Sequence, residues 1–301
     1  MNPKQLVITT FLFFLIHVLV GQNTIQDIAK QACSCIEKDT TILMQSRVQN
    51  CVSSIYAKNA QMNAKVLSDI TKLRQTLSDI KFKVYTECEY VVLKQKEARE
   101  LIYQGSKSDK ASSAFKKGNV FLVKQEYEKA LPFFKTAVEQ DTAFIEALDH
   151  LALCYRHIGD LKNAEDYYKK SLKIEPRGQT AVQNLAVIYS IQKIPEQAIV
   201  QYQALLEADL SNPEGYFGIA RVTLEINSDK KAALEKALEL TDIALNIYQI
   251  TKDPNLKDGL LLKGLIYYFL NDEKNAKKYL EEAKSKGVQI PAEIAKKLKI
   301  R

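Results

Sequence analysis

The chain is poor in the residues that most often carry out chemistry. It has three histidines, five cysteines and ten glycines among 301 residues. It contains no phosphate-cradling glycine loop, no Gly-x-Ser-x-Gly elbow, no Cys-x-x-Cys pair and no Cys-x-x-Cys-His haem attachment sequence. We therefore expect no catalytic residues, no cofactor and no enzymatic activity. The scattered Asp and Glu side chains are interpreted as the solvated faces of helices.

The two histidines that follow the first 21 residues do not form a recognisable metal site. His150 and His157 are seven residues apart on one predicted helix, which can bring them to one side two turns apart. No compact set of carboxylates accompanies them, so we predict no metal ligands here.

The start of the chain has the order of features typical of a secretory signal peptide. One lysine precedes an apolar run from Leu6 to Val20, and the small residue Gly21 follows. The run is short for a bilayer span, which needs about 20 apolar residues, so we expect cleavage after Gly21 rather than an uncleaved anchor. Together with the Lys, Ile, Asn and Gln usage, this leader predicts an exported protein, periplasmic or extracellular, and favours a bacterial source.

Proline and glycine are both absent from Thr24 to Glu100, which favours long uninterrupted helices. Two amphipathic stretches, near residues 24–38 and 41–58, are followed by a third with a regular apolar seam. The seam residues are Val66, Ile70, Leu73, Leu77, Ile80, Val84, Cys88 and Val91. We expect one long helix here, with the shorter helices folded back to bury the seam. A dimeric coiled coil through residues 66–91, in a self-associating structural assembly protein, is the alternative.

Four of the five cysteines, Cys33, Cys35, Cys51 and Cys88, lie in this helical module. Because export favours oxidation, we expect two disulfides rather than a metal site. Residues two apart on a helix point about 200° apart, so Cys33 and Cys35 should each pair with Cys51 or Cys88 rather than with each other. A cysteine-based metal or redox protein is a further alternative, although the module lacks Cys-x2-Cys knuckles and histidines. The fifth cysteine, Cys154, is predicted to be a buried, unreactive thiol.

The net charge of +7 comes mostly from the end of the chain. Residues 284–301 hold six Lys or Arg and one Glu, a sum of +5, which leaves +2 for the rest. A nucleic-acid binder needs a basic face across its body, so we expect no nucleic-acid partner. The basic residues suit the carbonyl end of a last helix.

A repeat of about 34 residues follows the glycine- and serine-containing stretch 103–110, where we place the module boundary. Small residues, alanines and aromatic residues each recur at this spacing in the first three units. They are, in turn, Gly118, Ala152 and Ala186; Ala130, Ala164 and Ala198; and Phe134, Tyr168 and Tyr202. A fourth unit aligns Ala220, Ala237 and Ala244 after a loop about five residues longer, and a fifth aligns Gly264, Tyr267, Ala276, Leu280 and Ala283.

This pattern closely resembles the tetratricopeptide repeat over about residues 111–287. The resemblance implies an all-α fold, a superhelical solenoid of five helix pairs in which small residues let the two helices of a pair approach and aromatic residues fill the space between them. The chain departs from the family pattern at three places. Thr142 stands where a proline is expected at the start of the second repeat, Thr241 stands at the fourth aromatic position, and the fourth unit has a longer loop. The predicted organisation is a signal peptide at 1–21, the cysteine-containing helical module at 22–104, the solenoid at 111–287 and a capping helix at 288–301.

The resemblance also implies a concave groove lined by the first helix, helix A, of each repeat. The corresponding positions are Phe115, Asn119, Leu122, Asp149, Arg156, His157, Phe217, Arg221, Leu265 and Tyr268. This aromatic, apolar and cationic mixture suits a peptide or a partner helix. Some family members hold a C-terminal carboxylate with a lysine–asparagine–arginine clamp, but Phe115 and Thr180 replace two clamp residues, so that specificity is not expected. We predict a non-catalytic exported protein–protein interaction scaffold whose partner the sequence does not identify.

Overall fold

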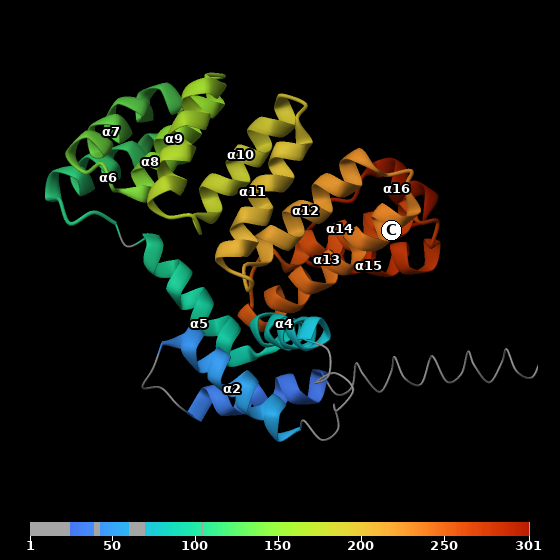
Figure 1. Ribbon diagram of the computed structural model, residues 1–301. Coiled ribbons are helices and arrows are strands. Elements are labelled where there is room, and N and C mark those ends of the chain that lie inside the picture. Colours follow the sequence, from blue (N-terminus) through green and yellow to red (C-terminus); the bar gives the residue numbers. More distant parts are fainter. Residues whose placement is uncertain (1–24, 39–42, 60–69, 104, 301) are drawn as a thin grey trace, which may run out of the picture. The chain divides into compact units, whose positions relative to one another are not determined.

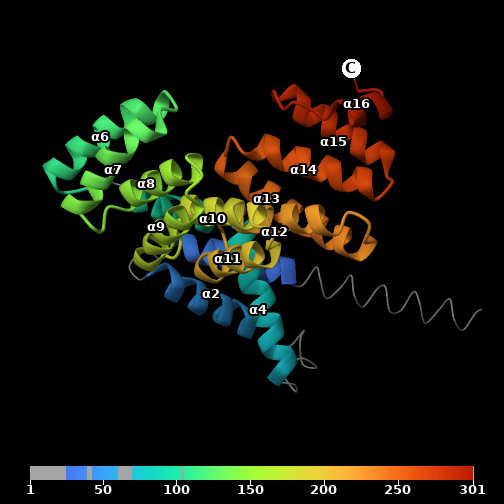
Figure 2. The same cartoon turned by 90° about the horizontal axis from the view of Figure 1, so that it is seen from above.

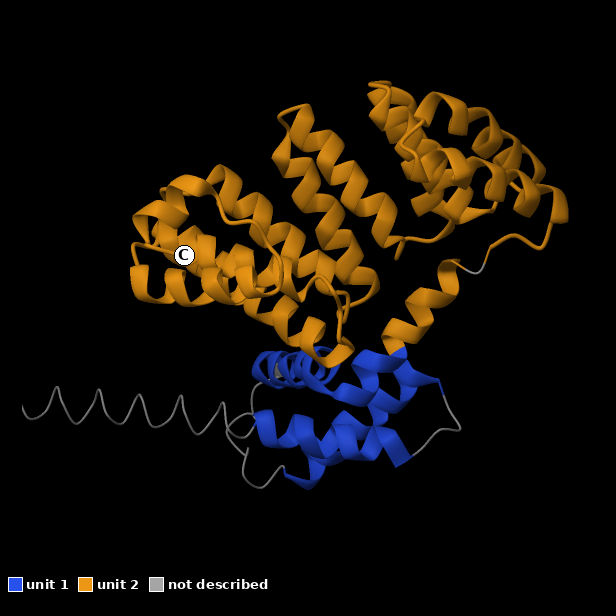
Figure 3. Ribbon diagram, turned by 180° about the vertical axis from the view of Figure 1, so that it is seen from behind, with its two compact units in different colours: residues 1–94 blue, residues 95–301 orange. Residues whose placement is uncertain are grey.

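The computed structural model describes residues 25–38, 43–59, 70–103 and 105–300. The chain divides into two compact units, Met1–Lys94 and Gln95–Arg301 (Figure 3). Every regular element in the described ranges is a helix, which confirms the predicted all-α class. The predicted signal peptide lies outside the described residues. No helix in the described part of the chain is long and apolar enough to span a membrane.

The first unit contains a helix at residues 25–38, α2 (Met44–Lys58), α4 (Ile70–Glu87) and the start of α5 (Glu89–Glu100) (Figure 1). One apolar cluster joins all of them, because each helix buries its own stripe against the others. The cluster includes Ile28, Ala32, Ile36, Val48, Val52, Ile80, Val84 and Val91, each no more than 1% exposed. From Ile80 to Val91 the predicted seam is therefore buried within one chain, whereas Leu73 and Leu77 are half-buried against the same cluster.

The helix expected over residues 66–91 is interrupted at Cys88, where α4 ends and α5 begins. Helical hydrogen bonds nevertheless continue across the junction, from Cys88 N to Val84 O (3.2 Å) and from Val92 N to Cys88 O (2.9 Å). The interruption coincides with the residue that is cross-linked to Cys33. Val66 lies outside the described residues.

After the end of α5, the second unit contains five successive helix pairs and a short last helix (Figures 1 and 2). The pairs are α6 (Asp109–Val123) with α7 (Tyr127–Gln140), α8 (Ile145–His157) with α9 (Leu161–Ile174), α10 (Gln179–Ile191) with α11 (Pro195–Ala208), α12 (Pro213–Ile226) with α13 (Lys231–Thr251), and α14 (Leu256–Phe269) with α15 (Glu273–Ser285). The last helix is α16 (Ala292–Lys297), after which Leu298 and Ile300 pack against Leu280.

Small residues allow the close approach within the pairs. A Cβ atom added to Gly118 on α6 would lie 2.7 Å from the Phe134 ring on α7, so only glycine fits there. Phe134 and Tyr168 are fully buried at equivalent positions. At the fourth equivalent position Thr241 is also buried, and its hydroxyl donates to the Ala237 carbonyl at 2.7 Å, which satisfies the polar group.

The extra residues of the fourth repeat extend a helix rather than a loop. The turn between α12 and α13 runs only from Asn227 to Lys230, whereas α13 has 21 residues and α7 has 14. No glycine or proline interrupts Lys231–Thr251, so helix continues where a longer loop was expected.

The second unit begins earlier than the stretch 103–110 that marks the sequence boundary. It starts at Gln95, inside α5. The reason is a set of contacts: Arg99 and Tyr103 hydrogen-bond to residues of the repeats.

Candidate partner-binding surface

The first predicted groove residues form a cluster that joins the first two repeats. The Phe115 ring stacks on His150 with centroids 5.1 Å apart, and His150 Nδ1 lies 3.1 Å from Asn119 Oδ1. Burial lowers the pKa of His150 to about 4, so the ring is neutral near pH 7 and its N–H can donate to the Asn119 oxygen. His150 thus contacts both groove residues, Phe115 and Asn119. Its seven-residue spacing from His157 in the sequence does not predict these contacts.

Asp149 is a predicted groove residue that the structure does not present to solvent. It is 1% exposed on α8, and its carboxylate lies beside the Ser171 hydroxyl of α9. Burial raises its pKa to about 7, and the negative charge of Glu146 adds to this rise. The family pattern placed this residue on the concave side, but contacts with the neighbouring helix bury it.

Two half-buried arginines lie on helix A of the second and fourth repeats. Arg156 Nη2 lies 2.9 Å from Nε2 of the exposed His157, whose ring stacks on Tyr127 at 4.1 Å. Arg221 donates to the Tyr202 hydroxyl at 3.4 Å and lies 3.6 Å from Glu225. Both guanidinium groups are held in place while part of each side chain stays accessible.

Apolar and aromatic side chains accompany these cations. Leu122, Phe217 and Leu265 are half-buried, and Phe217 meets Tyr248 edge to face with centroids 6.5 Å apart. Tyr268 on α14 lies under Lys297, whose Nζ is 4.8 Å from the ring centroid. Of the ten predicted residues, Arg156 and His157 contact each other, and Phe217 and Leu265 pack against the same buried cluster of α12, α13 and α14.

A buried polar network that sequence reasoning missed surrounds Glu214 on α12. Its carboxylate accepts hydrogen bonds from Tyr248 (2.6 Å), Asn255 (3.1 Å) and Gln183, which come from three other parts of the solenoid. Burial raises the pKa of Glu214. In the sequence Asn-Pro-Glu-Gly, an acidic residue at a helix start suggests only an interaction with the helix dipole, so no local signal indicated this network.

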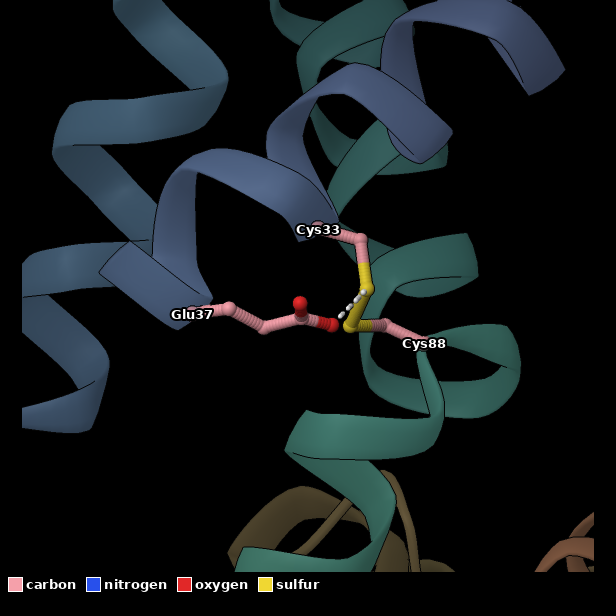
Figure 4. A group of neighbouring side chains, drawn as sticks. All are labelled: Cys33, Glu37 and Cys88. Atoms are coloured by element: carbon pink, nitrogen blue, oxygen red, sulfur yellow. Dashed lines mark hydrogen bonds between the residues drawn. A yellow bond between two sulfur atoms is a disulfide. The ribbon is translucent and has the colours of Figure 1, made fainter. Parts of the chain in front are cut away.

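The cysteines of the first unit form two disulfides, Cys33–Cys88 and Cys35–Cys51. This is one of the two connectivities that the sequence left open. A Glu37 oxygen lies 3.6 Å from the Cys33 sulfur, next to the disulfide drawn in Figure 4. The one group of possible metal ligands found in the described ranges consists of Cys33, Glu37 and Cys88. Its two sulfur atoms are bonded to each other, so they offer no thiolate to a metal ion.

Cys154 is a free cysteine and is fully buried on α8, as predicted. Burial raises the pKa of its thiol to about 12, so the thiolate form is negligible near pH 7.

Comparison with known proteins agrees with the helix pairing. Models of the tetratricopeptide repeat match residues 145–177 and 258–285, which cover α8–α9 and α14–α15. DnaJ protein P58IPK homolog B of Oryza sativa subsp. japonica is 27% identical over 198 residues, which are 63% of this chain and 40% of that protein. Hsp70-Hsp90 organizing protein 3 of Arabidopsis thaliana is 22% identical over 165 residues, 55% of this chain and 29% of that protein. The chain therefore spans less than half the length of these relatives.

A solved structure of pilF from Pseudomonas aeruginosa has a similar fold. The TM-score is 0.51 at 18% identity, over 67% of this chain and 86% of that one. With the helix pairs and their small-residue contacts, these findings show that the second unit contains tetratricopeptide repeats, which family models match at residues 145–177 and 258–285.

Proposed function

We propose that this chain is a non-catalytic interaction scaffold that binds a peptide or a partner helix along helix A of its repeats. The observation that carries the proposal is a set of half-buried side chains on the A helices of the first, second, fourth and fifth repeats: Leu122, Arg156, Phe217, Arg221 and Leu265. Half-buried apolar residues offer contact area at little cost in side-chain entropy, and arginines add hydrogen bonds to carboxylates or carbonyls.

The relatives support a role in protein interaction. One of them is named an Hsp70-Hsp90 organizing protein, a name that links it to two chaperones. For the present chain we do not propose binding of chaperone tails, because Phe115 and Thr180 stand at two positions of the carboxylate clamp. The partner we propose is a peptide with acidic and apolar side chains, which complement Arg156, Arg221 and Phe217.

We further propose that the protein acts after export, in the periplasm or outside the cell. Two disulfides support this proposal, because such bonds persist mainly in oxidising compartments. The self-association alternative has less support, since Ile80, Val84 and Val91 already pack within the first unit.

Site-specific photo-crosslinking in the native cell tests the groove. A photoreactive phenylalanine analogue replaces Phe217 on α12, and a control protein carries it at Val200, which is 56% exposed on α11. Capture of a defined protein from position 217 and not from position 200 supports the proposal. Capture from position 200 alone, or equally from both positions, would contradict it.

A further inference from the structure

Four residues ahead of the first repeat each contact a different turn between repeats or the helix end beside that turn. Lys96 and Arg99 lie in α5, Tyr103 ends the short helix η2 (Leu101–Tyr103), and Ser106 precedes α6. We call them the strap residues. All four belong to the second unit, which is orange in Figure 3.

The first two strap residues contact the last two turns between repeats. Lys96 Nζ donates to the carbonyl oxygen of Thr251, the last residue of α13, at 3.1 Å. Arg99 donates to the Asp209 carboxylate and, at 3.1 Å, to the Ser211 hydroxyl, both in the turn before α12. The contacts thus begin at the C-terminal side of the solenoid.

The other two strap residues contact the first two turns between repeats. The Tyr103 hydroxyl accepts a hydrogen bond of 3.4 Å from the backbone N–H of Thr180, at the start of α10. Ser106 donates to the Asp141 carboxylate, in the turn before α8. The strap therefore runs opposite to the order of the repeats, with one residue for each of the four turns.

The Arg99 contact is the most enclosed of the four. Arg99 is 9% exposed, Asp209 5% and Ser211 0%. The Ser211 hydroxyl and backbone N–H also donate to Asp209 Oδ1, at 2.7 and 2.9 Å. A buried ion pair requires such additional hydrogen bonds to offset desolvation, and removal of one partner leaves an uncompensated buried charge. The turn before α12 thus offers the Arg99 guanidinium group a carboxylate acceptor and a hydroxyl acceptor in a buried setting.

Repeats of a solenoid ordinarily interact only with their nearest neighbours. We propose that the four turns between repeats form a docking track for a basic–aromatic peptide segment, and that the strap fills this track within the same chain. Because one segment binds all four turns, it couples repeats that do not touch each other. This role is separate from partner binding along helix A.

Hydrogen exchange of the full chain tests the coupling. In Arg99→Ala we expect the amides of the turns near Thr180 and Asp141 to exchange about tenfold faster, although Arg99 contacts neither turn. Leu101→Ala is the matched control, because Leu101 lies between strap residues and is 60% exposed. Faster exchange confined to Asp209–Ser211, or equal changes in the control, would overturn the coupling.

A second variant covers the case in which Arg99→Ala unfolds the unit, which would show as uniformly fast exchange. Tyr103→Ala removes a half-buried side chain without leaving a buried charge. We expect faster exchange near both Thr180 and Ser211. A change at Thr180 alone would contradict the coupling.

A peptide with the sequence of residues 95–108 tests the track itself. In the wild-type chain the attached strap has an effective concentration in the millimolar range, so the free peptide competes poorly. We expect the labelled peptide to bind the double variant Arg99→Ala, Tyr103→Ala at least about tenfold more tightly than the wild type. A control peptide carries alanine at both positions. Equal affinity for both proteins, or equal binding of both peptides, would show that the track is not a peptide site.

Discussion

The Tyr248 hydroxyl donates a hydrogen bond of 2.6 Å to the Glu214 carboxylate inside the fourth repeat. Gln183 of the third repeat and Asn255, just before the fifth, donate to the same carboxylate. One side chain therefore connects three consecutive repeats. Since Glu214 is 3% exposed, its removal leaves the buried Tyr248 hydroxyl and the half-buried Gln183 and Asn255 amides without this acceptor.

Glu214→Ala should lower the free energy of unfolding of the solenoid by about 2–4 kcal/mol, because each unpartnered buried group costs about 1–3 kcal/mol. Denaturant unfolding followed by circular dichroism measures the loss. Glu235→Ala, at an exposed position of α13, is the control and should change stability by less than about 0.5 kcal/mol. Equal effects of the two substitutions would show that the network contributes little.

Asp149→Asn should remove a pH dependence of stability. The folded-state pKa of about 7 lies above the ordinary value of 3.8, so the folded chain keeps a proton that the unfolded chain loses. The contribution of Asp149 to stability is therefore greatest below about pH 4, falls as the pH rises to about 7 and stays low above that.

The variant lacks this loss of stability. Between about pH 4 and pH 8, its free energy of unfolding should therefore rise by about 1–4 kcal/mol relative to that of the wild type. Urea unfolding at both pH values measures the difference. Glu139→Gln on the exposed face of α7 is the matched control. A difference between variant and wild type that does not change with pH would rule out a raised pKa for Asp149.

Gly118→Val should destabilise the first repeat by about 1–3 kcal/mol through overpacking, because even a Cβ atom would lie 2.7 Å from the Phe134 ring. Thermal unfolding measures the effect. Ser113→Val on the exposed face of α6 introduces the same β-branched side chain without the clash. If both variants lose the same stability, helix propensity rather than the contact with Phe134 explains the loss.

The two disulfides should contribute unequally to the first unit. Cys33–Cys88 spans 55 residues and Cys35–Cys51 spans 16, so the loop-entropy relation assigns about 4 and about 3 kcal/mol. Replacing each pair by alanines and following hydrogen exchange of α2 against denaturant concentration tests this order. A larger loss of stability on replacing Cys35 and Cys51 than on replacing Cys33 and Cys88 would contradict this order.

The repeats were predictable because their signal is local and periodic. The 34-residue spacing of Gly118 and its counterparts reflects contacts between consecutive helices, and the structure places Gly118 against Phe134. The exclusion of a Cys33–Cys35 bond followed from helix geometry alone. Both inferences needed only short-range regularities.

Other features depend on contacts that no sequence pattern predicts. Arg99 and Asp209 are 110 residues apart, and neither belongs to a motif. The burial of Asp149 depends on side chains of α9, so the family position alone could not predict it. The extra length of the fourth repeat was visible, but its place in α13 was decided by the absence of helix-breaking residues.

Partner binding along helix A of the repeats is tested most directly by the affinity of a charge-reversed protein. Arg156→Glu combined with Arg221→Glu inverts both cations. Lys162→Glu combined with Lys193→Glu makes the same charge change at two exposed positions, one at the start of α9 and one in the turn between α10 and α11. With the partner captured by photo-crosslinking, isothermal titration of the folded proteins should show at least about tenfold weaker binding for the arginine variant alone. Unchanged affinity of the arginine variant, or equal weakening by the lysine variant, would contradict partner binding in the groove.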